Sequence, residues 1–223
     1  MSWLSDTLTS TIGRKLVMSL TGLFLIIFLV VHLIGNFQLL AGDNGLAFNA
    51  YAKFMTTNPL IKFTSYGLYA FILIHILMSI ALSVKNKKAR PVGYEKVKGS
   101  ANSSFSSRNM GILGFIIFVF LVIHMRSFWY EMHWGSIQPD TAGNKDLYSV
   151  VNAAFSQWWY VALYVVCMVG LAFHLSHGFS SAFQTLGINH KKYTPFIKKL
   201  GIVYAILIPA AFAIIPLIMF FNS

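Results

Sequence analysis

The chain has 223 residues, of which 57% are hydrophobic and 10% are charged, and its formal net charge is +11. A soluble domain usually has about 25% charged and about 45–50% apolar residues, so one small core cannot bury this apolar surplus. The composition therefore excludes an ordinary soluble domain and indicates that many side chains face lipid. Its single cysteine, Cys167, excludes an internal disulfide and a four-cysteine iron–sulfur cluster. The sequence has no glycine-rich motif for a flavin or nucleotide.

Five apolar stretches are long enough to cross about 30 Å of hydrocarbon as helices, which takes about 20 residues each. In chain order, we expect membrane-spanning helices over residues 16–40, 63–84, 110–127, 158–179 and 200–221. The longest connection, 128–157, is too short to form a domain. The sequence therefore predicts an all-α integral membrane protein, with residues 1–223 forming a single membrane domain built as a five-helix bundle.

Basic residues gather in three segments: the N-terminal segment, residues 85–109, and the connection after the fourth span. These segments hold 13 of the 17 Lys and Arg residues, whereas the other side holds Lys53, Lys62, Arg126 and Lys145. The positive-inside rule then places the N-terminus in the cytoplasm and the C-terminus outside. Since topology accounts for the positive charge, no nucleic acid partner is expected.

Histidine recurs at membrane depth, where an ionisable side chain is costly and is a candidate functional residue. It occurs in four of the five spans, at His32, His75, His124, His174 and His177. A lone histidine often only hydrogen-bonds between helices, but one in each of four successive spans indicates a shared role. At about 1.5 Å per residue, His32 and His124 fall in the outer half of the membrane, and His75 and His174 in the inner half. The depths predict two pairs, each drawn from two helices.

Two imidazoles at one depth on facing helices are what a six-coordinate haem iron needs, and such an iron passes electrons without activating oxygen. We therefore expect two haem b groups. His32 and His124 are the expected ligands of the outer haem, and His75 and His174 those of the inner haem. The chain has no CxxCH motif, so non-covalent attachment is expected.

Glycines near the histidines could let a flat macrocycle lie close to a helix backbone. Gly170 and Gly178 stand four residues on either side of His174, and Gly35 follows His32 by about one turn. Close packing of neighbouring helices is the alternative explanation for all three. His177 shares a helix face with His174 and is the alternative inner ligand.

Four histidine-containing segments resemble a known family in their order, spacing and topology. They are FLVVHLIGN around His32, ILIHIL around His75, VIHM around His124 and FHLSHGFSSAF around His174. Together they resemble the cytochrome b subunit of succinate dehydrogenases and fumarate reductases, in its single-subunit, five-helix, two-haem form. The resemblance covers nearly the whole chain. It favours His174 over His177, because the family's fourth ligand has a glycine four residues later.

The resemblance implies a dihaem membrane anchor in the bacterial cytoplasmic membrane. Such a chain passes electrons between a flavoprotein and an iron–sulfur subunit on the cytoplasmic face and membrane quinone, more often menaquinone than ubiquinone. It carries no catalytic dicarboxylate site of its own. Some fumarate reductases of the family have a proton-carrying glutamate two residues before the fourth ligand. Here that position is Ala172, so transmembrane proton transfer by this route is not expected.

A quinone beside the outer haem would complete the electron path, and Asn36, Gln38 and Trp129 lie near that level as candidate contacts for its head group. Two other functions fit the same histidines. One is the b-type subunit of a hydrogenase or formate dehydrogenase, which differs in its partner proteins. The other is a transporter that uses intramembrane histidines for metal ions or protons, which predicts a colourless protein.

Overall fold

The computed structural model describes residue 6, residues 10–89 and residues 103–222. This part of the chain is all-α, as predicted, and holds five helical runs long and apolar enough to cross a membrane. They are Thr11–Leu40, Pro59–Lys88, Phe105–Trp134, Trp158–Thr185 and Thr194–Phe221. They support a multi-pass membrane protein. Part of the predicted basic loop, residues 90–102, lies outside the described residues.

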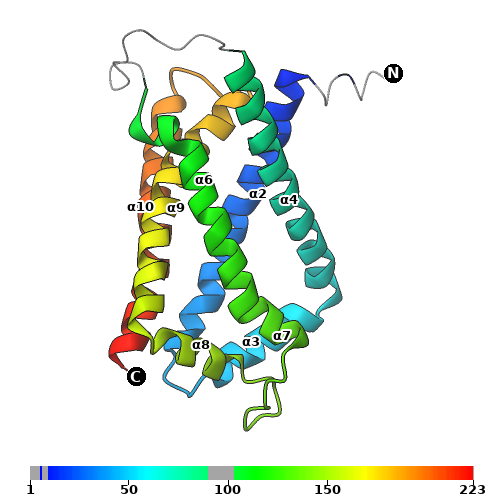
Figure 1. Cartoon of the computed structure of the whole chain (residues 1–223), viewed down its shortest axis with the longest axis vertical. Coiled ribbons are helices and arrows are strands. Elements are labelled where there is room, and N and C mark those ends of the chain that lie inside the picture. The colour runs from blue at the N-terminus through cyan, green and yellow to red at the C-terminus, as the bar shows by residue number, and fades with distance from the viewer. Residues whose placement is uncertain (1–5, 7–9, 90–102, 223) are drawn as a thin grey trace.

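The helices follow one another in the order shown in Figure 1. The long ones are α2 (Thr11–Phe37), α4 (Pro59–Lys88), α6 (Phe105–His124), α9 (Trp158–Thr185) and α10 (Thr194–Phe221). The short ones are η1 (Gln38–Leu40), α3 (Leu46–Thr57), the π-helical turn η2 (Met125–Trp129), α7 (Tyr130–Trp134) and α8 (Leu147–Phe155). Since α3, α7 and α8 gather at the end where the C-terminus lies, we call it the capped end.

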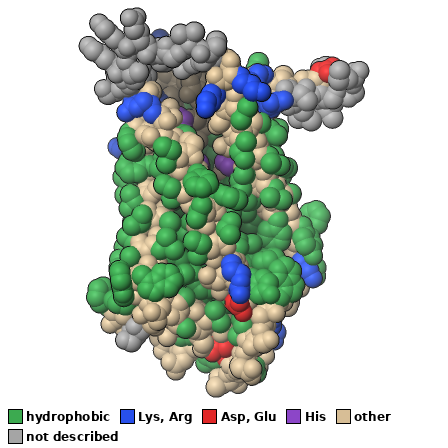
Figure 2. Space-filling view, viewed as in Figure 1, with side chains coloured by type: hydrophobic (Ala, Val, Ile, Leu, Met, Phe, Trp, Pro, Cys, Tyr) green, Lys and Arg blue, Asp and Glu red, His purple; other side chains and the backbone are tan. Residues whose placement is uncertain are grey.

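Basic side chains mark the opposite end of the bundle, where the chain starts (Figure 2). We call it the lysine-rich end; its described basic residues are Arg14, Lys15, Lys85, Lys87, Lys88, Arg108, Lys191, Lys192, Lys198 and Lys199. The two termini therefore lie at opposite ends of the molecule, as an odd number of spans requires.

Most of the helices extend beyond the stretches predicted from apolar content. Ser10, Asn58 and Ser104 each accept a hydrogen bond from a first-turn backbone N–H, which begins α2, α4 and α6 ahead of the apolar residues. The third run also continues through η2 to Trp134, inside the predicted connection 128–157. Hydropathy marks only the lipid-facing part of a helix, so polar first and last turns fall outside the predicted bounds.

Four of the long helices surround a common axis, and α10 packs along the outside of α9. Helix α2 packs against α4 on one side and α9 on the other, while α6 packs against α9. Within the described residues, α4 and α6 share no extended contact. The order around the axis is therefore α4, α2, α9, α6, which puts α2 diagonally opposite α6 and α4 diagonally opposite α9.

The two ends of the bundle differ in how tightly they pack. The buried apolar cluster lies at the capped end and consists of Leu33, Leu39, Phe48, Phe128, Leu147, Val151, Phe155, Tyr160, Val161, Tyr164, Ile215 and Met219. By contrast, α4 contributes no buried residue along its whole length. Helix α4 is therefore the least covered of the long helices.

Candidate functional site

The four expected histidine ligands meet as two pairs across the two diagonals of the bundle. The ring centroids of His32 on α2 and His124 on α6 lie 5.7 Å apart. Those of His75 on α4 and His174 on α9 lie 6.4 Å apart. The structure thus brings together the same two pairs that the depth argument predicts. His177 is not part of either pair, and its Nε2 lies 3.2 Å from the Ser181 hydroxyl of its own helix.

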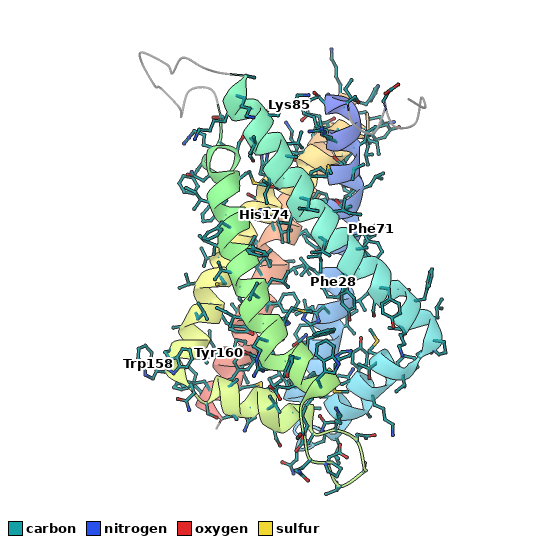
Figure 3. The ribbon with its side chains drawn as sticks, turned by 45° about the vertical axis from the view of Figure 1, so that its right-hand side comes forward. Phe28, Phe71, Lys85, Trp158, Tyr160 and His174 are labelled. Carbon is teal, nitrogen blue, oxygen red and sulfur yellow. The ribbon has the colours of Figure 1, made fainter. Side chains whose placement is uncertain are left out.

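The two pairs occupy two levels along the bundle axis. Thr21 and Gly22 of α2 lie beside His75, and His32 follows Gly22 by ten residues, which is about 15 Å of helix. Gly114 of α6 lies beside His174, and His124 follows it by ten residues, again about 15 Å. Two different helices therefore give the same separation. Figure 3 shows His174 on the Lys85 side of the bundle and Tyr160 near the opposite end.

Each pair has space and polarity suited to a metal ion between its rings. An imidazole nitrogen lies about 2 Å from the metal ion it binds, so two axial nitrogens are about 4 Å apart and the two ring centroids about 6 Å apart. The observed separations of 5.7 and 6.4 Å match this value. All four imidazoles are half-buried. Figure 2 shows histidine side chains in a hollow that opens below the lysine-rich end.

One buried nitrogen has no partner among the described residues. It is Nδ1 of His174, which is sequestered from solvent and makes no hydrogen bond there. Buried polar groups in native proteins are nearly always paired, so an orphaned one points to a missing group or water. The ring separation is compatible with a group bound between α4 and α9, and the orphaned Nδ1 marks His174 as a ring without a hydrogen-bond partner among the described residues.

Two hydroxyl groups orient two of the four rings, and sequence analysis did not single them out. The Thr21 hydroxyl on α2 lies 3.2 Å from Nδ1 of His75. The Tyr164 hydroxyl on α9 lies 3.0 Å from Nδ1 of His124. Helical spacing gives the depth of both residues but not the direction of their side chains. Thr21 precedes His32 by 11 residues and Tyr164 precedes His174 by ten, which places them about 16 Å and about 15 Å away, at the level of the other pair.

The predicted glycines differ in what surrounds them. A Cβ at Gly170 would lie in ordinary contact with Ile116 at 3.6 Å, and one at Gly178 would meet no atom within 4 Å. Space beside both glycines is thus compatible with a macrocycle. Gly35 has a different role, because a Cβ there would come within 2.5 Å of the Tyr51 ring on α3. Close packing of α3, the alternative explanation, accounts for Gly35.

Glycines that the sequence analysis passed over lie closer to the histidines. A Cβ at Gly22 would stand 3.3 Å from the His75 ring, and one at Gly114 would stand 4.0 Å from the His174 ring. Both glycines therefore leave room around the inner pair on helices that do not supply its ligands.

The three candidate quinone contacts do not come together in one group. The indole N–H of Trp129 donates to the Tyr69 hydroxyl of α4 at 2.8 Å, and its ring stacks on His133. The Asn36 amide donates to the His32 carbonyl at 2.7 Å, while Gln38 begins η1. Over residues 10–89 and 103–222, no hydrogen bond or ring contact joins Trp129 to Asn36 or Gln38.

The aromatic group around Trp129 includes a residue that the sequence did not indicate. Tyr69 of α4 contacts Trp129 at the end of the π-helical turn η2. π-helical turns occur often at functional sites, because the extra residue redirects the side chains that follow.

The described residues contain no group of three or more His, Cys, Asp or Glu side chains that could hold a metal ion by themselves. Comparison of the chain with protein-family models, with curated proteins and with solved structures gives no significant match.

Proposed function

We propose that this chain is the dihaem cytochrome b membrane anchor of a succinate:quinone oxidoreductase. The single observation that carries the proposal is the arrangement of the histidines. They form two facing pairs, one on each diagonal of the bundle, at two levels about 15 Å apart. Cofactor sites inside helical bundles are commonly built in this way, from side chains on facing helices.

In this proposal each histidine pair would hold one haem b. His32 and His124 would hold the outer group, and His75 and His174 the inner one. Haem with two histidine ligands supplies one-electron transfer and leaves no position open for oxygen. The chain's own residues set the distance between the groups, hold the imidazoles in place and keep the surroundings apolar. Gly170 and Gly178 leave space at the inner group.

The lysine-rich end is the proposed cytoplasmic face, on which a flavoprotein and an iron–sulfur subunit dock. Support comes from charge, because the basic residues there favour the cytoplasmic side of a membrane and attract acidic partners. Four of the six acidic residues instead lie at the capped end: Asp43, Glu131, Asp140 and Asp146. The partner assignment itself rests on the sequence resemblance.

Quinone, and menaquinone in particular, is the proposed substrate at the capped end. The outer pair lies furthest from the lysine-rich end, so a quinone beside it completes a path through the membrane. Trp129 remains the best-supported contact, since its indole lies against Tyr69 of α4 and Arg126 precedes it by three residues in η2. Asn36 and Gln38 are weaker candidates, because Asn36 already donates to its own helix.

The test is purification of the membrane complex followed by haem analysis. We expect pyridine haemochrome to give about two haems per chain, extractable into acidic organic solvent because attachment is non-covalent. We also expect a flavoprotein and an iron–sulfur subunit to co-purify, with succinate oxidation coupled to a menaquinone analogue. A colourless, fully assembled preparation overturns the proposal and favours a transporter. Co-purification with a hydrogenase or formate dehydrogenase subunit assigns the haems to a different complex.

A further inference from the structure

Each histidine pair contains one ring that is held by a hydroxyl from a helix outside the pair. His75 of α4 is held by Thr21 of α2, and His124 of α6 is held by Tyr164 of α9. In both cases the hydroxyl comes from the helix packed directly beside the ligand helix. In both cases it also contacts Nδ1, the nitrogen that points away from a group bound at Nε2.

The other contacts of Thr21 determine which way its hydrogen bond runs. A threonine hydroxyl has one proton to donate and two lone pairs to accept with. The Thr21 proton is taken by backbone carbonyls one turn earlier in α2, those of Val17 at 2.8 Å and Met18 at 3.1 Å. The oxygen is then left as an acceptor, so His75 Nδ1 carries the proton that bridges the 3.2 Å contact. A neutral imidazole has a single N–H, so Nε2 of His75 is the unprotonated nitrogen.

Tyr164 has a matching position in the outer pair. Its hydroxyl lies 3.0 Å from His124 Nδ1 and 3.3 Å from the hydroxyl of Tyr160, which is one turn earlier in α9. Both directions of hydrogen bonding satisfy these three groups. In the direction that leaves Nε2 of His124 free to bind a metal, His124 Nδ1 donates to Tyr164 and Tyr164 donates to Tyr160. Hydrogen bonds in such a chain strengthen one another in an apolar interior.

We propose that Thr21 and Tyr164 are positioning residues that each present Nε2 of one histidine to iron and lower the midpoint potential of that haem alone. A hydrogen-bond acceptor on the far nitrogen fixes the tautomer and ring orientation and makes an imidazole more electron-donating toward its metal. A more electron-donating ligand stabilises ferric over ferrous iron. This inference rests on the proposed function, and it adds a separate control for each haem.

Redox titration of the purified complex tests the inference with variants that remove one hydroxyl each. Thr21→Val keeps the shape of the side chain, and Tyr164→Phe keeps the ring. We expect Thr21→Val to raise the potential of the inner haem and Tyr164→Phe that of the outer haem. An upward shift of about 59 mV is a tenfold change in the one-electron equilibrium, which is the scale expected for one ligand hydrogen bond. The other haem keeps its potential in each variant.

Two control variants separate positioning from general packing. Thr21→Ser restores a hydroxyl and is expected to return the inner haem to the wild-type potential. Tyr204→Phe removes a hydroxyl that donates to the Ile26 carbonyl at 2.5 Å and touches no histidine, so it leaves both potentials unchanged. If Thr21→Val loses the inner haem while Thr21→Ser keeps it at the wild-type potential, the hydroxyl is required for ligation and the inference stands.

Several outcomes overturn the inference. Unchanged or lowered potentials in Thr21→Val and Tyr164→Phe rule out an accepting hydroxyl. A shift of both haems in either variant rules out separate control. These results require a wild-type complex that contains two haems. A wild-type complex without haem refutes the proposed function instead, so the two failures are distinct.

Discussion

The rings of His32 and His124 meet almost at right angles, with 88° between their planes, whereas 67° separates the planes of His75 and His174. Nearly perpendicular axial imidazoles leave the two π-type orbitals of a low-spin iron close in energy. We therefore expect both haems to give strongly anisotropic low-spin signals in electron paramagnetic resonance, with the outer haem the more axial of the two. Two ordinary rhombic signals, as from parallel rings, would contradict these ring orientations.

Substitution of either histidine of a pair should remove the absorption component of the same haem. His32→Ala and His124→Ala are each expected to lose the same low-temperature absorption component, because they leave one iron with a vacant position. His75→Ala and His174→Ala are expected to lose the other component. Loss of one component in both His32→Ala and His75→Ala would show that the pairing is wrong.

His177→Ala is the matched control for His174→Ala, because it removes an imidazole from the same face of α9. His177 contacts Ser181 on its own helix and is not part of a pair. We expect the variant to keep both haem components. If it loses the inner component while His174→Ala keeps it, the ligand choice is wrong.

Simple depth arithmetic was enough to predict the histidine pairs, because a transmembrane helix has a fixed rise and its ends are marked by hydropathy. It could not predict which side chains contact Nδ1 of His75 and Nδ1 of His124. Whether Thr21 faces His75 depends on how α2 is rotated about its axis, and apolar content on all sides of a lipid-exposed helix hides that rotation. The depth of Tyr164 was available from its ten-residue spacing to His174, but its direction was not.

The cap of short helices was also beyond the sequence argument. The sequence analysis treats residues 128–157 only as a connection between two spans, yet they contain α7 and α8. A long-range contact fixes this arrangement: Asn49 on α3 is fully buried and donates to Asp140 and Asp146. Its carbonyl oxygen accepts from the Tyr148 backbone N–H. Nothing local in the sequence connects residues about 90 positions apart.

Asn49→Ala should destabilise the capped end. The substitution removes three hydrogen bonds from a buried position and leaves the Tyr148 N–H unpaired. Leaving a buried polar group unsatisfied costs about 1–3 kcal/mol, so we expect a lower thermal midpoint in detergent, measured by tryptophan fluorescence. Asn152→Ala on α8 is the control, since no side-chain hydrogen bond of Asn152 is seen among the described residues. Equal midpoints for the two variants would show that the Asn49 contacts contribute nothing.

The capped end should also lose stability in acid. The Asn144 backbone N–H and the Asn49 amide lower the pKa of Asp140 below its ordinary 3.8. Burial tends to raise the pKa of Asp146, but hydrogen bonds from Ser149 and Asn49 outweigh it, so that this pKa is also lowered. A folded-state pKa below the unfolded value means that the unfolded chain binds more protons. Its stabilising contribution is therefore present above about pH 4 and is lost as pH falls through the folded value.

Unfolding measured between pH 6 and pH 3 checks this acid dependence. We expect the thermal midpoint to fall toward the acid end of the range, and the double variant Asp140→Asn, Asp146→Asn to show a flatter profile. If the thermal midpoint of the double variant falls with pH as steeply as that of the wild type, other groups govern the acid response.

Cysteine labelling should show which end of the bundle faces the cytoplasm. The only native cysteine, Cys167, is 5% exposed, so it gives little background. Lys88→Cys places an exposed thiol at the lysine-rich end, and Thr141→Cys places one at the capped end. If basic residues lie inside, a membrane-impermeant maleimide labels Thr141→Cys in intact spheroplasts and Lys88→Cys only after the membrane is opened. Labelling of Lys88→Cys from outside would reverse the topology, and with it the proposed docking face for the soluble subunits.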